Sequence, residues 1–266
     1  MILHGVESGA GSPVVLLHGL FGQAGNFGVV RRRLSAAHRV IALDLRNHGA
    51  SDHAPTMSYP AMAEDVLETL RQRGALPAAL VGHSMGGKVA MMAALQAPAA
   101  VARLMVVDIA PVRYPPGLRA LTAAMAAMPL HPGLTRTEAD AALADVASPT
   151  ERAFLLHNLH FGAAPRWRVG LAAIAAALPV LEDWPATAAA PYPGAVAFVA
   201  GARSDYIRPE HRPAIRAWFP AARFVTVKDA GHWVHADNPA AFLAVVAGFL
   251  AVQLRPLTLD REARPS

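Results

Sequence analysis

The chain has 266 residues, a formal net charge of +5 and no cysteine. Hydrophobic residues make up 54% and charged residues 16% of it, a composition typical of a globular chain and not of a disordered one. Without cysteine the chain can form no disulfide, no thiolate nucleophile and no Cys-ligated metal site. Apart from Arg31-Arg32-Arg33 its arginines are scattered, and no pattern of interleaved basic and aromatic residues suggests nucleic-acid binding, so we expect no nucleic-acid partner.

No lysine or arginine precedes Arg31, so the start of the chain lacks the charged region of a secretory signal. The apolar run 169–181 is shorter than the roughly 18 residues that a membrane-spanning helix needs. We therefore expect a cytoplasmic protein without a membrane span, present as a monomer or a homodimer.

Short apolar runs alternate with longer helical patterns along most of the chain. The runs typical of buried strands are 13–19, 39–45, 78–84, 103–108, 195–201 and 223–229. Helical patterns fall near 24–35, 60–73, 85–97, 210–218 and 238–253. This alternation predicts an α/β protein with a mostly parallel sheet that is covered by helices on both faces.

The alternation stops between residues 112 and 190, where the sequence is helical in texture and too long for a loop. We interpret this stretch as a helical cap that is inserted between two strands of the sheet. The predicted organisation is a core formed by 1–111 and 191–255, a cap at 112–190 and a polar tail at 256–266.

The segment Gly82-His83-Ser84-Met85-Gly86 is a G-x-S-x-G motif between a predicted strand and a predicted helix. In this setting the small residues permit a sharp turn, which exposes the serine at the carboxyl edge of the sheet. Ser84 is therefore the candidate nucleophile. The amide of the residue that follows it, Met85, is a candidate oxyanion donor.

A second oxyanion donor is expected from the loop after an earlier strand. His18-Gly19 follows the first predicted strand, and we assign the donor to the amide of Leu20. We interpret His18 as a structural residue of this loop and Phe21 as a wall of the pocket.

The chain has 12 histidines, and position along the chain selects one of them. His232 lies in a loop after the last predicted strand, at the sheet edge that carries Ser84. It is therefore the candidate general base. We interpret His235 and His48 as structural, although His48 could also line the pocket.

Five segments occur in an order that resembles the α/β-hydrolase superfamily, namely VLLHGLFG, DLRNHGASD, GHSMGGK, VVDIAP and AGHWVHADNP. Within it the chain is most similar to the esterase branch of YbfF-like and abhydrolase domain-containing protein 11-like enzymes. The resemblance implies the α/β-hydrolase fold, with a Ser-His-Asp triad and no cofactor or metal. We expect Lys88, on the helix after the nucleophile, to make a structural ion pair.

Two aspartates compete for the role of triad acid. In most of the superfamily the acid lies three residues after a glycine of the later strand, and counting from Gly201 reaches Ser204, so that Asp205 is one residue late. Resemblance to the YbfF-like branch places the acid at Asp108. The apolar neighbours of Asp108 also favour a paired carboxylate over a solvated one. We prefer Asp108 and keep Asp205 as the alternative.

The resemblance implies hydrolysis of carboxylic esters, with acyl thioesters such as acyl-CoA as further candidate substrates. We expect a small-molecule substrate with an apolar acyl group under the Ala-, Leu- and Met-rich cap. The same triad also serves carbon–carbon bond hydrolases and cofactor-free lyases, and a non-catalytic binding protein on this scaffold is a third possibility. Dehalogenase and epoxide hydrolase chemistry is disfavoured, because it requires aspartate where this chain has Ser84.

Overall fold

A seven-stranded sheet forms the centre of the molecule, with the strand order β1-β3-β2-β4-β5-β8-β9. The computed structural model describes residues 1–185 and 187–251. The strands are β1 Gly5–Ser8, β2 Pro13–Leu17, β3 Arg39–Leu43, β4 Ala78–His83, β5 Val101–Val107, β8 Ala195–Gly201 and β9 Ala222–Val227. All neighbouring strands are parallel except β1, which pairs antiparallel with β3.

The six predicted strands are all present, and apart from the partly exposed edge strand β9 their nearly continuous apolar residues are mostly buried. Every residue of β4 is buried. The edge strand β1 was not predicted. Its sequence Gly-Val-Glu-Ser is polar and none of its residues is fully buried, so it carries no apolar run that would mark a strand.

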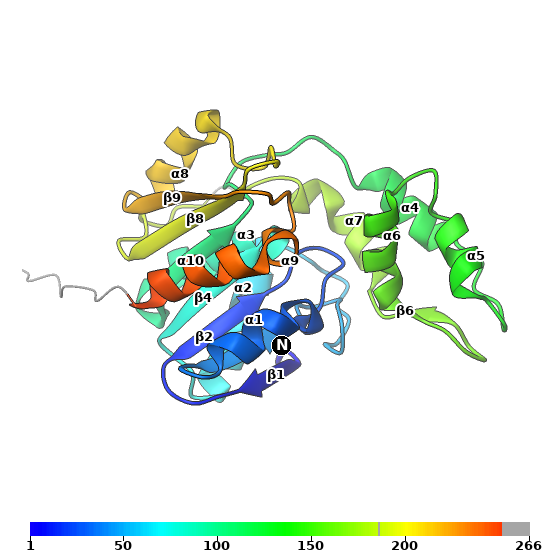
Figure 1. Ribbon diagram of the computed structural model, residues 1–266, viewed down its shortest axis with the longest axis horizontal. Coiled ribbons are helices and arrows are strands. Elements are labelled where there is room, and N and C mark those ends of the chain that lie inside the picture. Colours follow the sequence, from blue (N-terminus) through cyan, green and yellow to red (C-terminus); the bar gives the residue numbers. More distant parts are fainter. Residues whose placement is uncertain (186, 252–266) are drawn as a thin grey trace, which may run out of the picture.

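Helices cover both faces of the sheet, as predicted (Figure 1). On one face the buried side chains of α2, α3 and α8 join the larger hydrophobic cluster, and on the other face α1 and α10 join a second cluster. The helices outside the cap are α1 Gly28–Leu34, α2 Tyr59–Gln72, α3 Met85–Gln96, α8 Arg212–Trp218, α9 Val234–Asp237 and α10 Pro239–Ala251. None of the helices in the described part of the chain is long and apolar enough to cross a membrane.

The segment 112–190, which we call the cap, lies between β5 and β8, and its described residues form four α-helices. They are α4 Arg119–Ala127, α5 Arg136–Ala141, α6 Pro149–Leu155 and α7 Leu171–Leu181. Figure 1 shows them gathered to one side of the sheet, together with a short unpredicted ribbon of β6 Leu159–His160 and β7 Arg166–Trp167. The division into core and cap domains stays a prediction, and the predicted tail 256–266 lies outside the described residues.

Two of the cap helices begin with the same capping box. In α5 the pair is Thr135 and Glu138, and in α6 it is Ser148 and Glu151. In each pair the hydroxyl accepts from the backbone amide of the glutamate, and the glutamate carboxylate accepts from the amide of the hydroxyl residue. Such boxes satisfy two amides that the first turn leaves unpaired.

Lys88 connects the sheet-covering helix α3 to both ends of the cap. Its side chain is completely buried, and its ammonium donates to the carbonyl oxygens of Val112 at 3.0 Å and Asp183 at 2.7 Å. The rings of Tyr59 and Tyr114 lie 5.4 and 5.0 Å from the same nitrogen. The expected ion pair is therefore wrong, since backbone carbonyls and aromatic faces hold this charge. The Asp183 carboxylate adds only a Coulombic attraction.

We expect the stability of the protein to depend on pH through Lys88. Burial lowers its pKa from 10.5 to about 7, so between these values the unfolded chain binds more protons than the folded one. The free energy of unfolding therefore rises with pH in this window, by roughly 3 to 5 kcal/mol over its full width. Urea unfolding of the wild type and Lys88→Met between pH 7 and 9.5 should give a difference that grows in favour of the wild type. A difference that is flat across this range would contradict the assignment.

Candidate active site

Ser84 occupies a strained turn between β4 and α3. Its φ is 52° and its ψ is −122°, values that a non-glycine residue seldom adopts. A side chain at Gly82 would come within 2.2 Å of the Gly86 carbonyl oxygen, and one at Gly86 within 2.4 Å of the Leu17 carbonyl oxygen. The two glycines of the motif are thus required by the close contact of strand, turn and helix, as a nucleophile elbow demands.

Asp108 follows β5 and is completely buried, with a φ of 54°. Its Oδ2 lies 2.8 Å from Nδ1 of His232 and accepts a second hydrogen bond from the Ser204 hydroxyl. Its Oδ1 accepts from the Gly201 amide at 3.1 Å. Three partners thus fix the carboxylate, and one of them is the predicted base.

The rival acid Asp205 lies apart from this arrangement. Its side chain is exposed, whereas Ser204, one residue earlier, contacts the carboxylate of Asp108. The position three residues after Gly201 is therefore occupied by a hydroxyl that donates to Asp108. Nothing in the sequence around Ser204 signals this contact.

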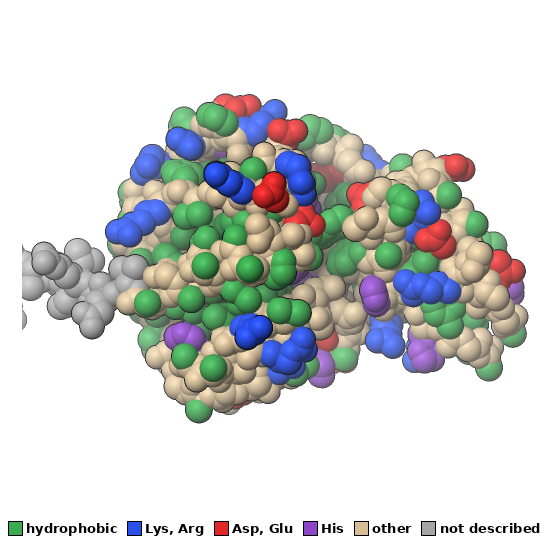
Figure 2. Space-filling model, viewed as in Figure 1, with side chains coloured by type: hydrophobic (Ala, Val, Ile, Leu, Met, Phe, Trp, Pro, Cys, Tyr) green, Lys and Arg blue, Asp and Glu red, His purple; other side chains and the backbone are tan. Residues whose placement is uncertain are grey.

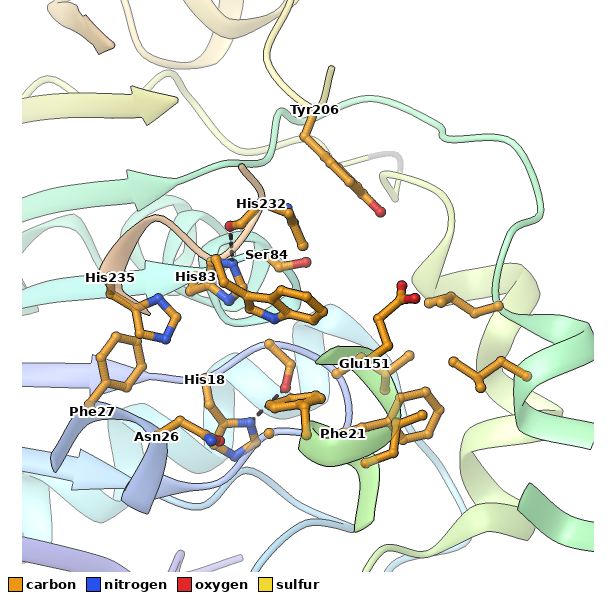
Figure 3. A pocket seen from close by; sticks show the side chains of 18 residues that line it. His18, Phe21, Asn26, Phe27, His83, Ser84, Glu151, Tyr206, His232 and His235 are labelled. Atoms are coloured by element: carbon orange, nitrogen blue, oxygen red, sulfur yellow. Dashed lines mark hydrogen bonds between the residues drawn. The ribbon is translucent and has the colours of Figure 1, made fainter. Parts of the chain in front are cut away.

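Besides the Asp108 carboxylate, two contacts hold His232 in the loop that follows β9. Its ring stacks on Tyr206 with a centroid separation of 4.0 Å and an interplanar angle of 22°. Its carbonyl oxygen lies 2.8 Å from Nε2 of His83. The side chain remains 25% exposed, and both His232 and Ser84 line the same cavity (Figure 3).

Two further histidines surround His232 and stay neutral. Burial is the main cause that lowers the pKa of His83 well below 6.5 and that of His235 to about 4, and the neighbouring His232 lowers both further. The rings of His83 and His232 lie 4.7 Å apart, and those of His83 and His235 lie 4.9 Å apart. His83 is the variable residue of the G-x-S-x-G motif, and the motif alone gives no sign of its contact with His232.

Two other histidines organise the loop that carries the candidate oxyanion donor. His18 accepts from the Leu45 amide at 3.0 Å and lies 2.8 Å from the Gly19 carbonyl, and burial lowers its pKa. His48 accepts from the Phe21 amide at 3.1 Å, and burial lowers its pKa to about 3. Each neutral ring thus accepts a hydrogen bond from the backbone of another loop, which agrees with the structural interpretation of His18 and His48.

The two predicted oxyanion donors belong to residues close to Ser84 in the chain or in the cavity. Met85 is the first residue of α3, where helix amides have no partner within the helix. Leu20 lines the cavity and follows Gly19, at which a side chain would come within 3.2 Å of the Ser84 Cβ. The Phe21 amide is already bonded to His48, and Phe21 itself lines the cavity.

The cavity has a volume of about 220 Å³ and is lined mostly by apolar surface. Leu118, Leu121, Phe154 and Leu155 of the cap face Leu20, Phe21, Phe27 and Trp233 of the core across it. Figure 3 shows Ser84, His232 and Tyr206 on its core side and Glu151 of α6 on its cap side. In the described part of the chain no cluster of three His, Cys, Asp or Glu could hold a metal ion.

Comparison with known proteins identifies the family of the chain. Residues 12–239 match the family model of the alpha/beta hydrolase fold. The chain is 42% identical over 248 residues to mouse sn-1-specific diacylglycerol lipase ABHD11, covering 90% of this chain and 80% of the relative. It is 36% identical over 241 residues to Esterase YbfF of Escherichia coli, covering 90% and 93%.

A solved structure of a marine microorganism esterase superposes with a TM-score of 0.89 at 32% identity, over 93% of this chain and 99% of that one. The chain therefore belongs to the α/β-hydrolase fold family, in the branch of carboxylic ester hydrolases that includes YbfF and ABHD11.

Proposed function

We propose that this protein is a serine esterase whose catalytic triad is Ser84, His232 and Asp108. The observation that carries the proposal is the 2.8 Å contact between His232 Nδ1 and the buried Asp108 carboxylate, with Ser84 on the wall of the same cavity. A carboxylate on Nδ1 holds the imidazole in the tautomer whose Nε2 can accept a proton.

The proposed reaction is a two-step acyl transfer. His232 Nε2 takes the hydroxyl proton of Ser84 as the oxygen attacks the ester carbonyl, and the oxyanion forms between the amides of Leu20 and Met85. His232 then protonates the leaving alcohol, and an acyl-enzyme remains on Ser84. In the second step His232 activates water, which releases the acid and restores Ser84.

Asp108 stabilises the positive charge that His232 gains in each step. His83 and His235 are neutral, so neither opposes this charge. The hydrogen bond from His83 to the His232 carbonyl and the stacked Tyr206 ring keep the imidazole oriented. Removal of one oxyanion donor in a site of this kind costs about 3 kcal/mol of transition-state stabilisation.

The apolar lining of the cavity favours an acyl group of the same character. Leu118, Leu121 and Phe154 from the cap would cover such a group while its carbonyl reaches Ser84. The same chemistry accepts a thioester, because thiolate is a better leaving group than alkoxide. We therefore propose esters with apolar acyl groups as substrates and acyl thioesters as a second class.

A fluorophosphonate probe tests the proposal directly. We expect the folded protein to take up one phosphonyl group, mapped to Ser84 by peptide mass spectrometry, with parallel loss of 4-nitrophenyl butyrate hydrolysis. Ser84→Ala should remain unlabelled, whereas Ser35→Ala, which changes a partly exposed serine after α1, should label like the wild type. Folded wild type that neither reacts with the probe nor hydrolyses the ester would refute a serine esterase and support a binding protein on this scaffold.

A further inference from the structure

Glu151 introduces a carboxylate into a cavity that is lined mostly by apolar surface. Among the described residues that line this cavity, it is the only one with a carboxylate side chain. It belongs to the first turn of α6, and its side chain is partly buried. In Figure 3 the carboxylate points from the cap toward the space that Ser84 and Tyr206 border.

The capping box explains only part of this placement. Oε2 of Glu151 accepts from the Ser148 amide at 2.8 Å, and a glutamine could accept the same bond. Glu138 makes the equivalent bond in α5 with an exposed side chain, so capping alone does not require the carboxylate to face the cavity.

The Glu151 carboxylate affects the pKa of the neighbouring Tyr206 phenol. Burial is the main cause that raises the pKa of Tyr206, and the carboxylates of Asp108 and Glu151 raise it further. The effect extends to any group that enters the cavity, because a charge with apolar walls around it is poorly screened. An ionised carboxylate also accepts hydrogen bonds and donates none.

We propose that Glu151 is a specificity-determining residue, which makes the site reject esters that carry a negative charge near the scissile bond and accept neutral and cationic ones. This inference rests on the proposed esterase function. It is opposite to what the net charge of +5 suggests. Figure 2 shows Lys and Arg side chains spread over the outer surface of the face drawn, whereas the cavity itself carries Glu151.

The test is a matched series of esters. In one set the acyl part of a 4-nitrophenyl ester is neutral (butyrate), anionic (hemisuccinate) or cationic (4-trimethylammoniobutyrate). In the other set the charge of the alcohol part varies, as in the neutral ethyl, cationic choline and anionic glycolate esters of butyric acid. For each we would measure kcat/KM with wild type, Glu151→Gln and the matched control Glu138→Gln.

We expect Glu151→Gln to raise kcat/KM for anionic relative to neutral esters by at least about tenfold in one set or both, and to lower the preference for cationic esters. Glu138→Gln, which removes the same charge from an equivalent capping box, should leave both ratios unchanged. The capping bond survives in both variants, so their thermal stabilities should stay close to that of the wild type.

Each other outcome counts against the inference. Unchanged ratios in Glu151→Gln in both sets, a parallel fall for all esters, or an equal shift in Glu138→Gln would overturn it. If wild type hydrolyses the neutral ester, such a result refutes the specificity role alone. If wild type hydrolyses no neutral ester, the proposed function fails and this inference fails with it.

Discussion

Replacing Asp108 by asparagine is expected to lower kcat for ester hydrolysis by about 10,000-fold, as loss of the acid does in other Ser-His-Asp triads. An amide at this position cannot stabilise the imidazolium of His232. It also presents an N–H to Nδ1, which favours the wrong tautomer. Steady-state kinetics on 4-nitrophenyl butyrate would measure the loss, and unfolding in urea would verify that the variant is folded.

Two companion variants separate Asp108 from its rival. Asp205→Asn changes an exposed side chain and should retain near wild-type activity. In the double variant Asp108→Asn with Ser204→Asp, a carboxylate replaces the hydroxyl that contacts Asp108 Oδ2, and activity should recover at least about tenfold over Asp108→Asn. An inactive Asp205→Asn beside an active Asp108→Asn would reverse the assignment of the acid.

Two substitutions of Ser84 should abolish activity alike but differ in their effect on stability. Both Ser84→Ala and Ser84→Gly lack the nucleophile, and their kcat should fall by about 10,000-fold or more. The φ of 52° at this position is strained for alanine and serine and is accessible to glycine. Ser84→Gly should therefore be more stable than Ser84→Ala by about 1 kcal/mol.

Chemical denaturation of the two variants at one pH would give this difference. At an unstrained position the alanine variant is the more stable of the two, since glycine has the greater conformational entropy in the unfolded chain. An alanine variant that is the more stable of the two would show that the elbow stores no strain at Ser84.

The sequence predicted the six parallel strands and the helices that cover them, because buried strands and amphipathic helices have strong local patterns. It also led to Ser84 and His232 as candidates, since parallel strands bring their carboxyl ends to one edge of a sheet. The preference for Asp108 over Asp205 rests largely on the family resemblance. Their triad roles, like the oxyanion roles of Leu20 and Met85, stay predictions until the variants are measured.

Features that depend on packing between distant segments could not be read from the sequence. The partners of Lys88 lie 24 and 95 residues away and are backbone carbonyls, so no residue type signals them. In the sequence Glu151 has the pattern of an ordinary helix-capping glutamate. Only the position of α6 beside the cavity makes it a lining residue as well. The strand β1 depends on pairing with β3 and has no apolar pattern of its own.

The anchoring of the cap by Lys88 has a consequence for how relatives of this protein can diverge. Both carbonyl acceptors belong to the main chain, and every amino acid supplies that group. Mutations in the cap can therefore alter its side chains, and with them the substrates it admits, without removing the acceptors that fasten it. The anchor requires particular side chains only at Lys88 of α3 and at Tyr59 and Tyr114, whose rings lie 5.4 and 5.0 Å from the Lys88 ammonium. Most side chains of the cap can thus change, and with them one wall of the cavity, while the anchor of the cap is kept.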